Sequence, residues 1–199
     1  MARINFIFIN IILFLLWLIF AYRHSVAFLL YPRAYILLFI VAETLLAFLF
    51  LLRKQENKIS KKKSDWLIAS LATFIPLSIQ PSSQAIQIEI GTALMVAGSL
   101  LYIFSLISLN RSMGIIPADR GIKTNGLYRL VRHPIYLSYL ILYTGYILAS
   151  FSYYNFIVYI FTIIFIFARI LIEEKFLSSN PVYLEYKNRV RQKLIPYIL

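Results

Sequence analysis

The residues best suited to chemistry lie in two places, the segment Gly126–Tyr136 and the group Arg169, Glu173 and Glu174. A pair of long apolar runs joined by a short polar turn separates them. Ionisable groups at the ends of a membrane hairpin are costly to place and often mark a functional site. Because the two helices of a hairpin are antiparallel, both groups are expected to return to one membrane surface and to meet there.

One end of this hairpin has the features of a helix start. Pro134 directly follows His133, and proline suits the first helical position because its missing N–H had no partner there. His133 is therefore expected near a helix N-terminus. Free backbone N–H groups and the positive end of the helix dipole would favour a carboxylate or another anion at this point. Arg132 adds a fixed positive charge beside them.

The other end of the hairpin carries an ion-pair pattern. Arg169 and Glu173 are four residues apart, so a helix places them on one face, where they can pair or line one pocket. Glu174 lies about 100° further round the helix. Taken singly, such residues at span ends often have only structural roles. The combination of both groups across one hairpin is more specific than its parts.

The apolar composition indicates an integral membrane protein. Of 199 residues, 61% are hydrophobic, the mean hydropathy is +0.78, and runs of bilayer-spanning length recur along the chain. At about 20 residues per span, the chain has room for five or six spans and no large soluble domain. Cysteine is absent and there are two histidines, which argues against thiol chemistry and against a metal cluster.

Six apolar runs are the expected spans. The third run is short and contains Pro76, so a kinked or partly re-entrant helix leaves five or six crossings open. A cleaved signal peptide competes for the first run, although that run is long for one. The runs are Ile4–Tyr22, Ala34–Leu52, Trp66–Ile79, Ile86–Leu109, Ile135–Phe151 and Phe156–Ile172, with uncharged or polar turns at Pro81–Gln84 and Ser152–Asn155.

Charge outside and inside these runs carries different information. The net charge of +12 lies mainly between the runs, so membrane orientation explains it better than nucleic-acid binding. The basic residues 53–65, 110–132 and the tail are expected on the cytoplasmic side, and 53–65 could also contact anionic membrane lipids. Glu43 stands alone within the second run, where an interhelical hydrogen bond is preferred over a cavity-lining role. No partner protein is indicated.

From Asn110 to Pro196 the sequence resembles the isoprenylcysteine carboxyl methyltransferases and the related membrane phospholipid N-methyltransferases. The likeness rests on G-I-K-T-N-G-L-Y at 121–128, R-H-P-I-Y at 132–136, the Arg169 and Glu173-Glu174 pattern, and Y-L-E-Y at 183–186. The first three spans carry no such signature.

The sequence therefore predicts an all-α polytopic membrane helical bundle of five to six transmembrane helices. Residues 1–199 form a single membrane domain, with N-terminal transmembrane helices in 1–109 and a catalytic, cofactor-binding half in 110–199, whose pocket lies at the cytoplasmic face.

The resemblance implies S-adenosyl-L-methionine as the cofactor and S-adenosyl-L-homocysteine as its product. Arg169 would face the substrate, where a guanidinium can hold a carboxylate in a fork of paired hydrogen bonds. Glu173 would accept hydrogen bonds from the amino or ribose hydroxyl groups of the cofactor. Arg169 and Glu173 are the expected catalytic residues, and no metal is expected. The expected cofactor-binding residues are Arg120, Gly121, Ile122, Lys123, Tyr128, His133, Pro134, Ile135, Tyr136 and Glu173.

The sequence departs from the family pattern in two places. The segment between Glu174 and Tyr183 is shorter than usual, with Ser178–Pro181 in place of a glycine-containing turn, and Ser138 stands where glycine is common. The shorter segment puts the identity of the substrate in doubt more than it affects methyl transfer.

The predicted function is therefore a multi-pass membrane methyltransferase whose lipophilic substrate enters from the bilayer. The leading acceptor is the carboxylate of a prenylated cysteine, and the rivals are a phospholipid head-group amine and a small thiol. An NADPH-dependent membrane reductase of the sterol type is the alternative from another enzyme class, and a non-enzymatic lipid-binding scaffold is the third. The expected location is a bacterial or archaeal plasma membrane or the endoplasmic reticulum, with the active site facing the cytoplasm.

Overall fold

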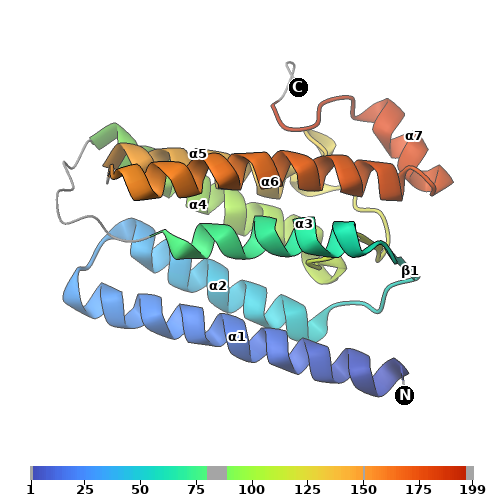
Figure 1. Ribbon diagram of the computed structural model, residues 1–199, viewed down its shortest axis with the longest axis horizontal. Helices are drawn as coiled ribbons and strands as arrows, with labels where there is room; N and C mark the ends of the chain where they lie inside the picture. The colour runs from blue at the N-terminus through green and yellow to red at the C-terminus, as the bar shows by residue number, and fades with distance from the viewer. Residues whose placement is uncertain (1, 80–88, 150, 196–199) are drawn as a thin grey trace.

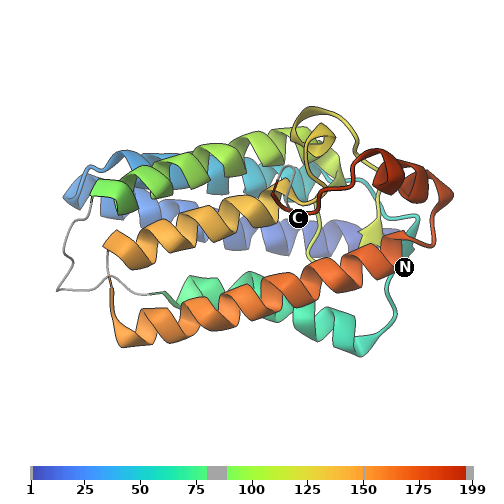
Figure 2. The same ribbon diagram turned by 90° about the horizontal axis from the view of Figure 1, so that it is seen from above.

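The computed structural model of the protein describes residues 2–79, 89–149 and 151–195, and it is 77% helical. The predicted all-α class is thus confirmed. Helices α1 to α6 pack as three pairs, α1 with α2, α4 with α5 and α3 with α6, and α7 lies at one end (Figures 1 and 2). The helices are α1 (Ala2–Leu30), α2 (Ala34–Leu52), α3 (Lys63–Phe74), α4 (Glu89–Leu109), α5 (Pro134–Ala149), α6 (Tyr153–Leu177) and α7 (Pro181–Arg189).

Four helices of the described chain are long and apolar enough to cross a membrane, namely α1, α2, α4 and α6. Helix α5 is equally apolar but has 16 residues, and α3 has 12. A span needs about 20 residues, or fewer where the bilayer adapts. Four of the predicted spans therefore meet the length requirement, and the total of five or six crossings stays a prediction.

Some predicted helix boundaries agree with the structure and others differ: α6 begins at Tyr153, inside the predicted turn, and ends at Leu177 instead of Ile172. Helix α2 begins and ends as predicted. Helix α1 continues past the expected end at Tyr22 to Leu30, because the next proline is Pro32. The third run is short and irregular as expected, since α3 passes into a 3₁₀ turn (Ile75–Ser78) that contains Pro76. The predicted turn at 81–84 and the start of the fourth run at 86–88 lie outside the described residues.

Close backbone packing fixes α5 against α4. A Cβ atom added at Gly98 would lie 2.6 Å from the backbone nitrogen of Leu142, and one added at Gly91 would lie 2.8 Å from the carbonyl oxygen of Gly145. Such distances exclude any side chain without a backbone shift. Gly91 and Gly98 therefore allow the close approach of the two helix backbones. This contact holds α5, whose first residues belong to the candidate site.

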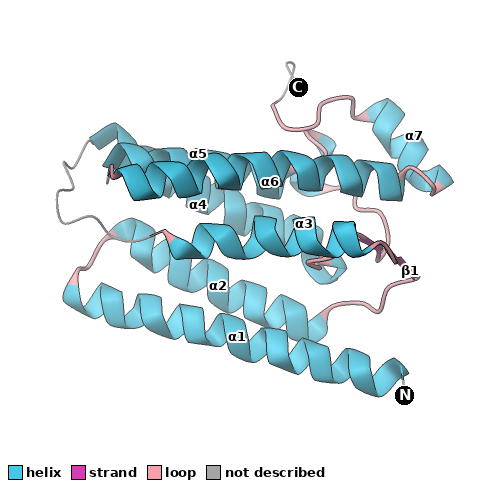
Figure 3. Ribbon diagram, viewed as in Figure 1, coloured by secondary structure: helices cyan, strands magenta, loops and turns pink. Residues whose placement is uncertain are grey.

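The basic loop after α2 packs onto the loop after α4. Strand β1 (Lys58–Ile59) pairs antiparallel with β2 (Ala118–Asp119), and Figure 3 shows the strands at the same end of the bundle as α7. The backbone N–H of Lys54 also donates to the carbonyl of Arg111 at 2.8 Å. Beyond the predicted topology signal, residues 53–60 therefore form part of the cover over this end of the bundle.

Candidate active site

A cavity lies between the helices, lined by residues of α1 to α6, of α7 and of the loops after α4. One part of its lining is apolar and another part is polar. Helices α1 to α5 supply an apolar part, and the loops and helix ends supply a polar part. The apolar part includes Trp17, Phe39, Leu46, Phe50 and Leu142, and the polar part includes Arg120, Lys123, His133, Glu173 and Tyr183.

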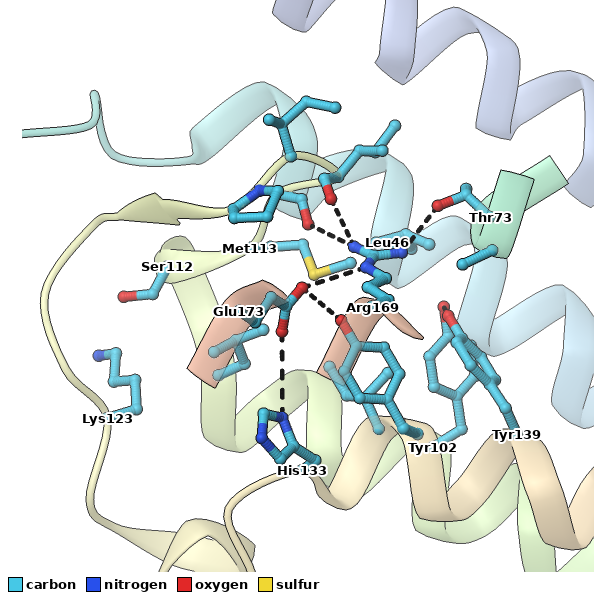
Figure 4. A pocket seen from close by; sticks show the side chains of 18 of the residues that line it. Leu46, Thr73, Tyr102, Ser112, Met113, Lys123, His133, Tyr139, Arg169 and Glu173 are labelled. Carbon is cyan, nitrogen blue, oxygen red and sulfur yellow. Dashed lines mark hydrogen bonds and ion pairs between the residues drawn. The ribbon is translucent and has the colours of Figure 1, made fainter. Parts of the chain in front are cut away.

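Three side chains that we call the boundary cluster, Tyr136, Arg169 and Glu173, line the cavity where the two parts join (Figure 4). Glu173 Oε1 accepts hydrogen bonds from the Tyr136 hydroxyl at 2.5 Å and from Arg169 Nε at 3.1 Å. The Arg169 guanidinium also stands over the Tyr136 ring, 5.3 Å from its centroid. The predicted pairing of Arg169 and Glu173 on one helix face is confirmed.

Arg169 has further partners that tie α6 to α3 and to the loop after α4. Nη1 donates to the hydroxyl of Thr73 at 2.8 Å, while Nη2 donates to the carbonyls of Gly114 at 3.2 Å and Ile115 at 2.6 Å. Arg169 is buried. The structure thus holds the guanidinium in one orientation, with Thr73 as its neutral partner on the cavity side.

Glu174 faces away from the boundary cluster and is the centre of a second group, which we call the tail anchor. Its carboxylate accepts from Arg132 Nε at 2.7 Å, from the Tyr183 hydroxyl at 2.9 Å and pairs with His133 Nε2 at 2.9 Å. Lys187 Nζ lies 3.4 Å from Oε2. The tail anchor (Arg132, His133, Glu174, Tyr183 and Lys187) joins α6 to α7 and to the start of α5.

The start of α5 is only partly as predicted. Pro134 occupies the first helical position, as expected. The N–H groups of Arg132 and His133, however, donate to the carbonyls of Gln192 at 3.0 Å and Lys193 at 2.9 Å. The expectation that backbone N–H groups here stay free for an anion is wrong for these two residues, because the C-terminal segment of the chain supplies carbonyl partners.

His133 connects the two groups. Its Nε2 belongs to the tail anchor, and its Nδ1 lies 3.9 Å from Glu173 Oε2, the oxygen on the cavity side of the boundary cluster. The predicted meeting of His133 and Glu173 across the hairpin is confirmed. Figure 4 shows Ser112 and Lys123 on one side of Glu173 and Tyr102 and Tyr139 on the other, toward the apolar part.

The loop after β2 forms the remaining wall of the polar part. Gly121 has a φ of +91°, which favours glycine, and Ile122 and Lys123 follow it along the cavity. Tyr128 packs with the buried Tyr186, whose hydroxyl donates to the Tyr128 carbonyl at 2.8 Å. Burial raises the pKa of the Tyr128 phenol well above its usual value.

Of the expected catalytic and cofactor-binding residues, all but Pro134 line the cavity, whereas the neighbouring Glu174 does not. Pro134 is fully buried and sets the start of α5, but it is not part of the cavity lining. Sequence reasoning missed Thr73 and Glu56, and neither residue belongs to a motif. Glu56 Oε2 lies 3.3 Å from Arg120 Nη2.

Glu43 has both of the roles that were considered for it. Its Oε2 lies 2.7 Å from His24 Nδ1, so the predicted interhelical hydrogen bond is confirmed, with α1 as the partner helix. Glu43 also lines the apolar part of the cavity. His24 stacks on Phe39, with ring centroids 5.2 Å apart. A polar pair therefore stands within the membrane-spanning part of the bundle.

Comparison with known proteins supports the resemblance read from the motifs. Residues 86–181 match the family model of the phospholipid methyltransferases, a match that covers α4, α5, α6 and the loops forming the polar part of the cavity. No curated protein matches the chain. The family implies a membrane methyltransferase and suggests that it acts on lipids. This segment is thus similar to the phospholipid methyltransferases, the family of the membrane methyltransferases related to isoprenylcysteine carboxyl methyltransferases.

Proposed function

We propose that the protein transfers a methyl group from S-adenosyl-L-methionine to the polar end of a lipophilic substrate. The observation that carries this proposal is the single cavity with a polar part, an apolar part and the boundary cluster between them. A charged cofactor suits the polar part, and a hydrocarbon chain suits the apolar part. The acceptor group and the transferred methyl would then meet beside Tyr136, Arg169 and Glu173.

The donor groups of the polar part fit such a cofactor. Glu173 Oε2 is the less occupied oxygen of its carboxylate, with His133 Nδ1 at 3.9 Å, and it can accept from amino or ribose hydroxyl groups. Arg120 and Lys123 supply positive charge for a carboxylate. Bound S-adenosyl-L-methionine supplies a methyl group on a sulfonium. The protein's own residues then fix the direction of approach and exclude water, and both effects favour an in-line displacement.

The carboxylate of a prenylated cysteine is the leading acceptor. Arg169 Nη1 donates to the neutral hydroxyl of Thr73 at the cavity wall. A substrate carboxylate in the place of that hydroxyl would form a stronger, charge-assisted hydrogen bond. A carboxylate is ionised near neutral pH, so this reaction needs no general base. The rate would depend on alignment and on the exclusion of water.

A phospholipid amine is the second candidate, and the family match favours it. Glu43 and Glu173 both line the cavity, and a carboxylate attracts an ammonium group. An amine must lose a proton before or during methyl transfer, and Glu173 is placed to take it. The two acceptors therefore differ in the residue on which they depend: Arg169 for a carboxylate and Glu173 for an amine.

We assign the polar end of the cavity to the cytoplasmic surface. The basic loops 53–65 and 110–132 lie at this end, and cytoplasmic loops carry an excess of lysine and arginine. The cofactor would enter from the cytoplasm, and the lipophilic substrate would enter sideways from the bilayer. A cysteine introduced by Lys61→Cys or Lys62→Cys tests this orientation. In intact cells it is expected to be protected from a membrane-impermeant thiol reagent.

Calorimetric titration of detergent-purified protein with S-adenosyl-L-homocysteine tests the cofactor. The wild type is expected to bind it, and Glu173→Gln is expected to bind it roughly 30-fold more weakly, because a hydrogen bond to a charged group is lost. Glu185→Gln, at an exposed position on α7, is the matched control. Saturable binding of NADPH without any response to S-adenosyl-L-homocysteine would overturn the proposal in favour of a reductase.

Methyl transfer from a labelled cofactor identifies the acceptor. An N-acetyl S-farnesylcysteine and vesicles of phosphatidylethanolamine are offered to the wild type and to Arg169→Lys. Transfer to the farnesylcysteine that Arg169→Lys abolishes supports the carboxylate acceptor. Transfer to the vesicles alone would replace it with the amine acceptor.

A further inference from the structure

We propose that Arg120 and Glu56 form an anion subsite in the polar part of the cavity. Arg120 Nε would donate to the carboxylate in the methionine part of the cofactor, and Glu56 would act as the positioning residue that holds the guanidinium. This inference rests on the proposed function and deepens it, because it names the group that recognises one end of the cofactor. It also brings a residue from the loop after α2 into the site.

The hydrogen bonds of the buried arginines single out Arg120. Arg53, Arg132 and Arg169 each donate through Nε to a side-chain oxygen, at 2.6 Å, 2.7 Å and 3.1 Å respectively. Arg120 is equally buried, with 6% of its surface exposed, and it lines the cavity. Within the described part of the chain, its Nε is the buried side-chain polar atom that has no hydrogen-bond partner.

An unpaired buried N–H is unfavourable, and a bound anion would remove that penalty. A buried donor without an acceptor costs the full desolvation of the group, and more so when the group is charged. Burial lowers the pKa of Arg120 below its usual value, while Glu56 and Glu173 oppose that effect. A carboxylate beside Nε would supply both the missing acceptor and the missing negative charge.

The surroundings hold Arg120 in place for this contact. Its Nη2 reaches Glu56 Oε2 at 3.3 Å, and its carbonyl accepts from the Ser112 hydroxyl at 3.1 Å. Gly114 leaves room for the guanidinium, because a Cβ atom there would collide with Nη1. Glu56 therefore holds one terminal nitrogen, Gly114 leaves room for the other, and Nε is left for a ligand.

Backbone pairing holds Glu56 itself. The N–H of Asn57 donates to the carbonyl of Asp119 at 2.8 Å, and the N–H of Ser60 donates to the carbonyl of Pro117 at 3.0 Å. Asp119 is also fixed from the other side, since its Oδ2 accepts from Asn180 Nδ2 at 2.8 Å. The loop after α2 and the turn before α7 therefore clamp the strand that precedes Arg120.

The charges of the polar part match a zwitterionic amino-acid group. Arg120 and Glu173 line the same part of the cavity, and the charge of Glu173 acts to raise the pKa of Arg120. A carboxylate would pair with Arg120, and the neighbouring ammonium group would pair with Glu173. The subsite would thus distinguish a complete cofactor from one that lacks its carboxylate.

Calorimetry with two ligands tests the subsite. S-adenosyl-L-homocysteine carries the carboxylate, and its decarboxylated analogue S-adenosyl-3-thiopropylamine lacks it but keeps the amine. Arg120→Lys, which has no Nε–H donor at that position, is expected to bind the first ligand about tenfold more weakly or worse. Glu56→Gln is expected to bind it about threefold to tenfold more weakly. Both variants are expected to bind the analogue within about twofold of the wild type.

The outcomes separate this inference from the proposed function. If the wild type binds neither ligand, the proposed function fails. If the wild type binds both, and the variants lose affinity for both equally, Arg120 and Glu56 have only a structural role and the subsite is overturned. Glu185→Gln is the control for a lost surface carboxylate, and Glu56→Asp replaces Glu56→Gln if the latter does not fold. A loss of affinity in Glu56→Asp for S-adenosyl-L-homocysteine but not for its decarboxylated analogue then supports the subsite.

Discussion

Glu173 and Glu174 are adjacent on α6, yet they belong to two different regions of the protein. Glu174 forms the tail anchor with four side chains, two from the segment just before α5 and two from α7. Glu173 faces the cavity, where Tyr136 and Arg169 occupy one oxygen. The Glu174 side chain is 8% exposed and that of Glu173 is 17% exposed. The helix turn of about 100° between them separates a structural carboxylate from one available to a ligand.

The two regions also differ in what a lost carboxylate leaves behind. In the tail anchor, the buried Arg132 would lose its ion-pair partner and keep only the carbonyls of Val190 and Arg191. In the boundary cluster, Arg169 would keep Thr73 and two carbonyls as partners. The comparison therefore predicts that substitutions at Glu174 mainly change stability, whereas substitutions at Glu173 mainly change ligand binding.

Glu174→Ala is expected to have the largest effect. Removing one partner of a buried ion pair costs about 3–5 kcal/mol, because the remaining charge stays buried and unpaired. The free energy of unfolding, followed by thermal or denaturant unfolding in detergent, measures this loss. Glu185→Ala on the exposed face of α7 is the matched control. Equal stability of the two variants would remove the structural role assigned to Glu174.

Glu173→Gln is expected to keep the fold but to bind S-adenosyl-L-homocysteine more weakly. The amide has the size of the carboxylate and can still accept from Tyr136, so the unfolding free energy should fall by at most about 1 kcal/mol. The affinity for S-adenosyl-L-homocysteine should fall roughly 30-fold, since a charged acceptor is replaced by a neutral one. If Glu173→Gln unfolded as readily as Glu174→Ala, the two carboxylates would not have the different roles that we assign to them.

Tyr183→Phe examines a single bond of the tail anchor. The variant should lose about 1 kcal/mol of stability near neutral pH, because Glu174 keeps its other donors. Burial and the neighbouring Glu174 raise the pKa of Tyr183. A phenol with a raised pKa in the folded state stabilises fully below about pH 10, and this contribution falls as the pH rises further. The stability difference between wild type and variant should therefore be constant from pH 8 to about pH 9.5 and shrink as the pH rises past about 10, and a difference that stays constant up to about pH 10.5 would contradict the assigned environment.

Much of this arrangement could be read from the sequence. The antiparallel hairpin places His133 near Glu173, and the spacing of Arg169 and Glu173 places them on one face of α6. The glycines of α4 predicted its close contact with α5. These features depend on local spacing or on the direction of consecutive helices, which a sequence pattern reports directly.

The rest depends on contacts between segments that share no local pattern. The carbonyls of Gln192 and Lys193 cap the start of α5 from an irregular segment at the other end of the chain. Glu56 meets Arg120 through two-residue strands that are too short to predict. In each case the backbone hydrogen bonds of a loop, which any residue can make, decide the position of a charged side chain.

Tyr136→Phe is the counterpart of Tyr183→Phe in the boundary cluster, and it is expected to have the smallest effect on stability. The ring that supports the Arg169 guanidinium remains, and Glu173 keeps Arg169 Nε as a donor. Without the hydroxyl, Glu173 is held by one bond instead of two, so the affinity for S-adenosyl-L-homocysteine should fall about threefold to tenfold. Tyr139→Phe is the control, because its hydroxyl donates to Tyr102 and not to Glu173. If Tyr136→Phe lowered stability as much as Tyr183→Phe and left binding unchanged, the boundary cluster would be a second structural anchor, and the distinction between the two carboxylates would fail.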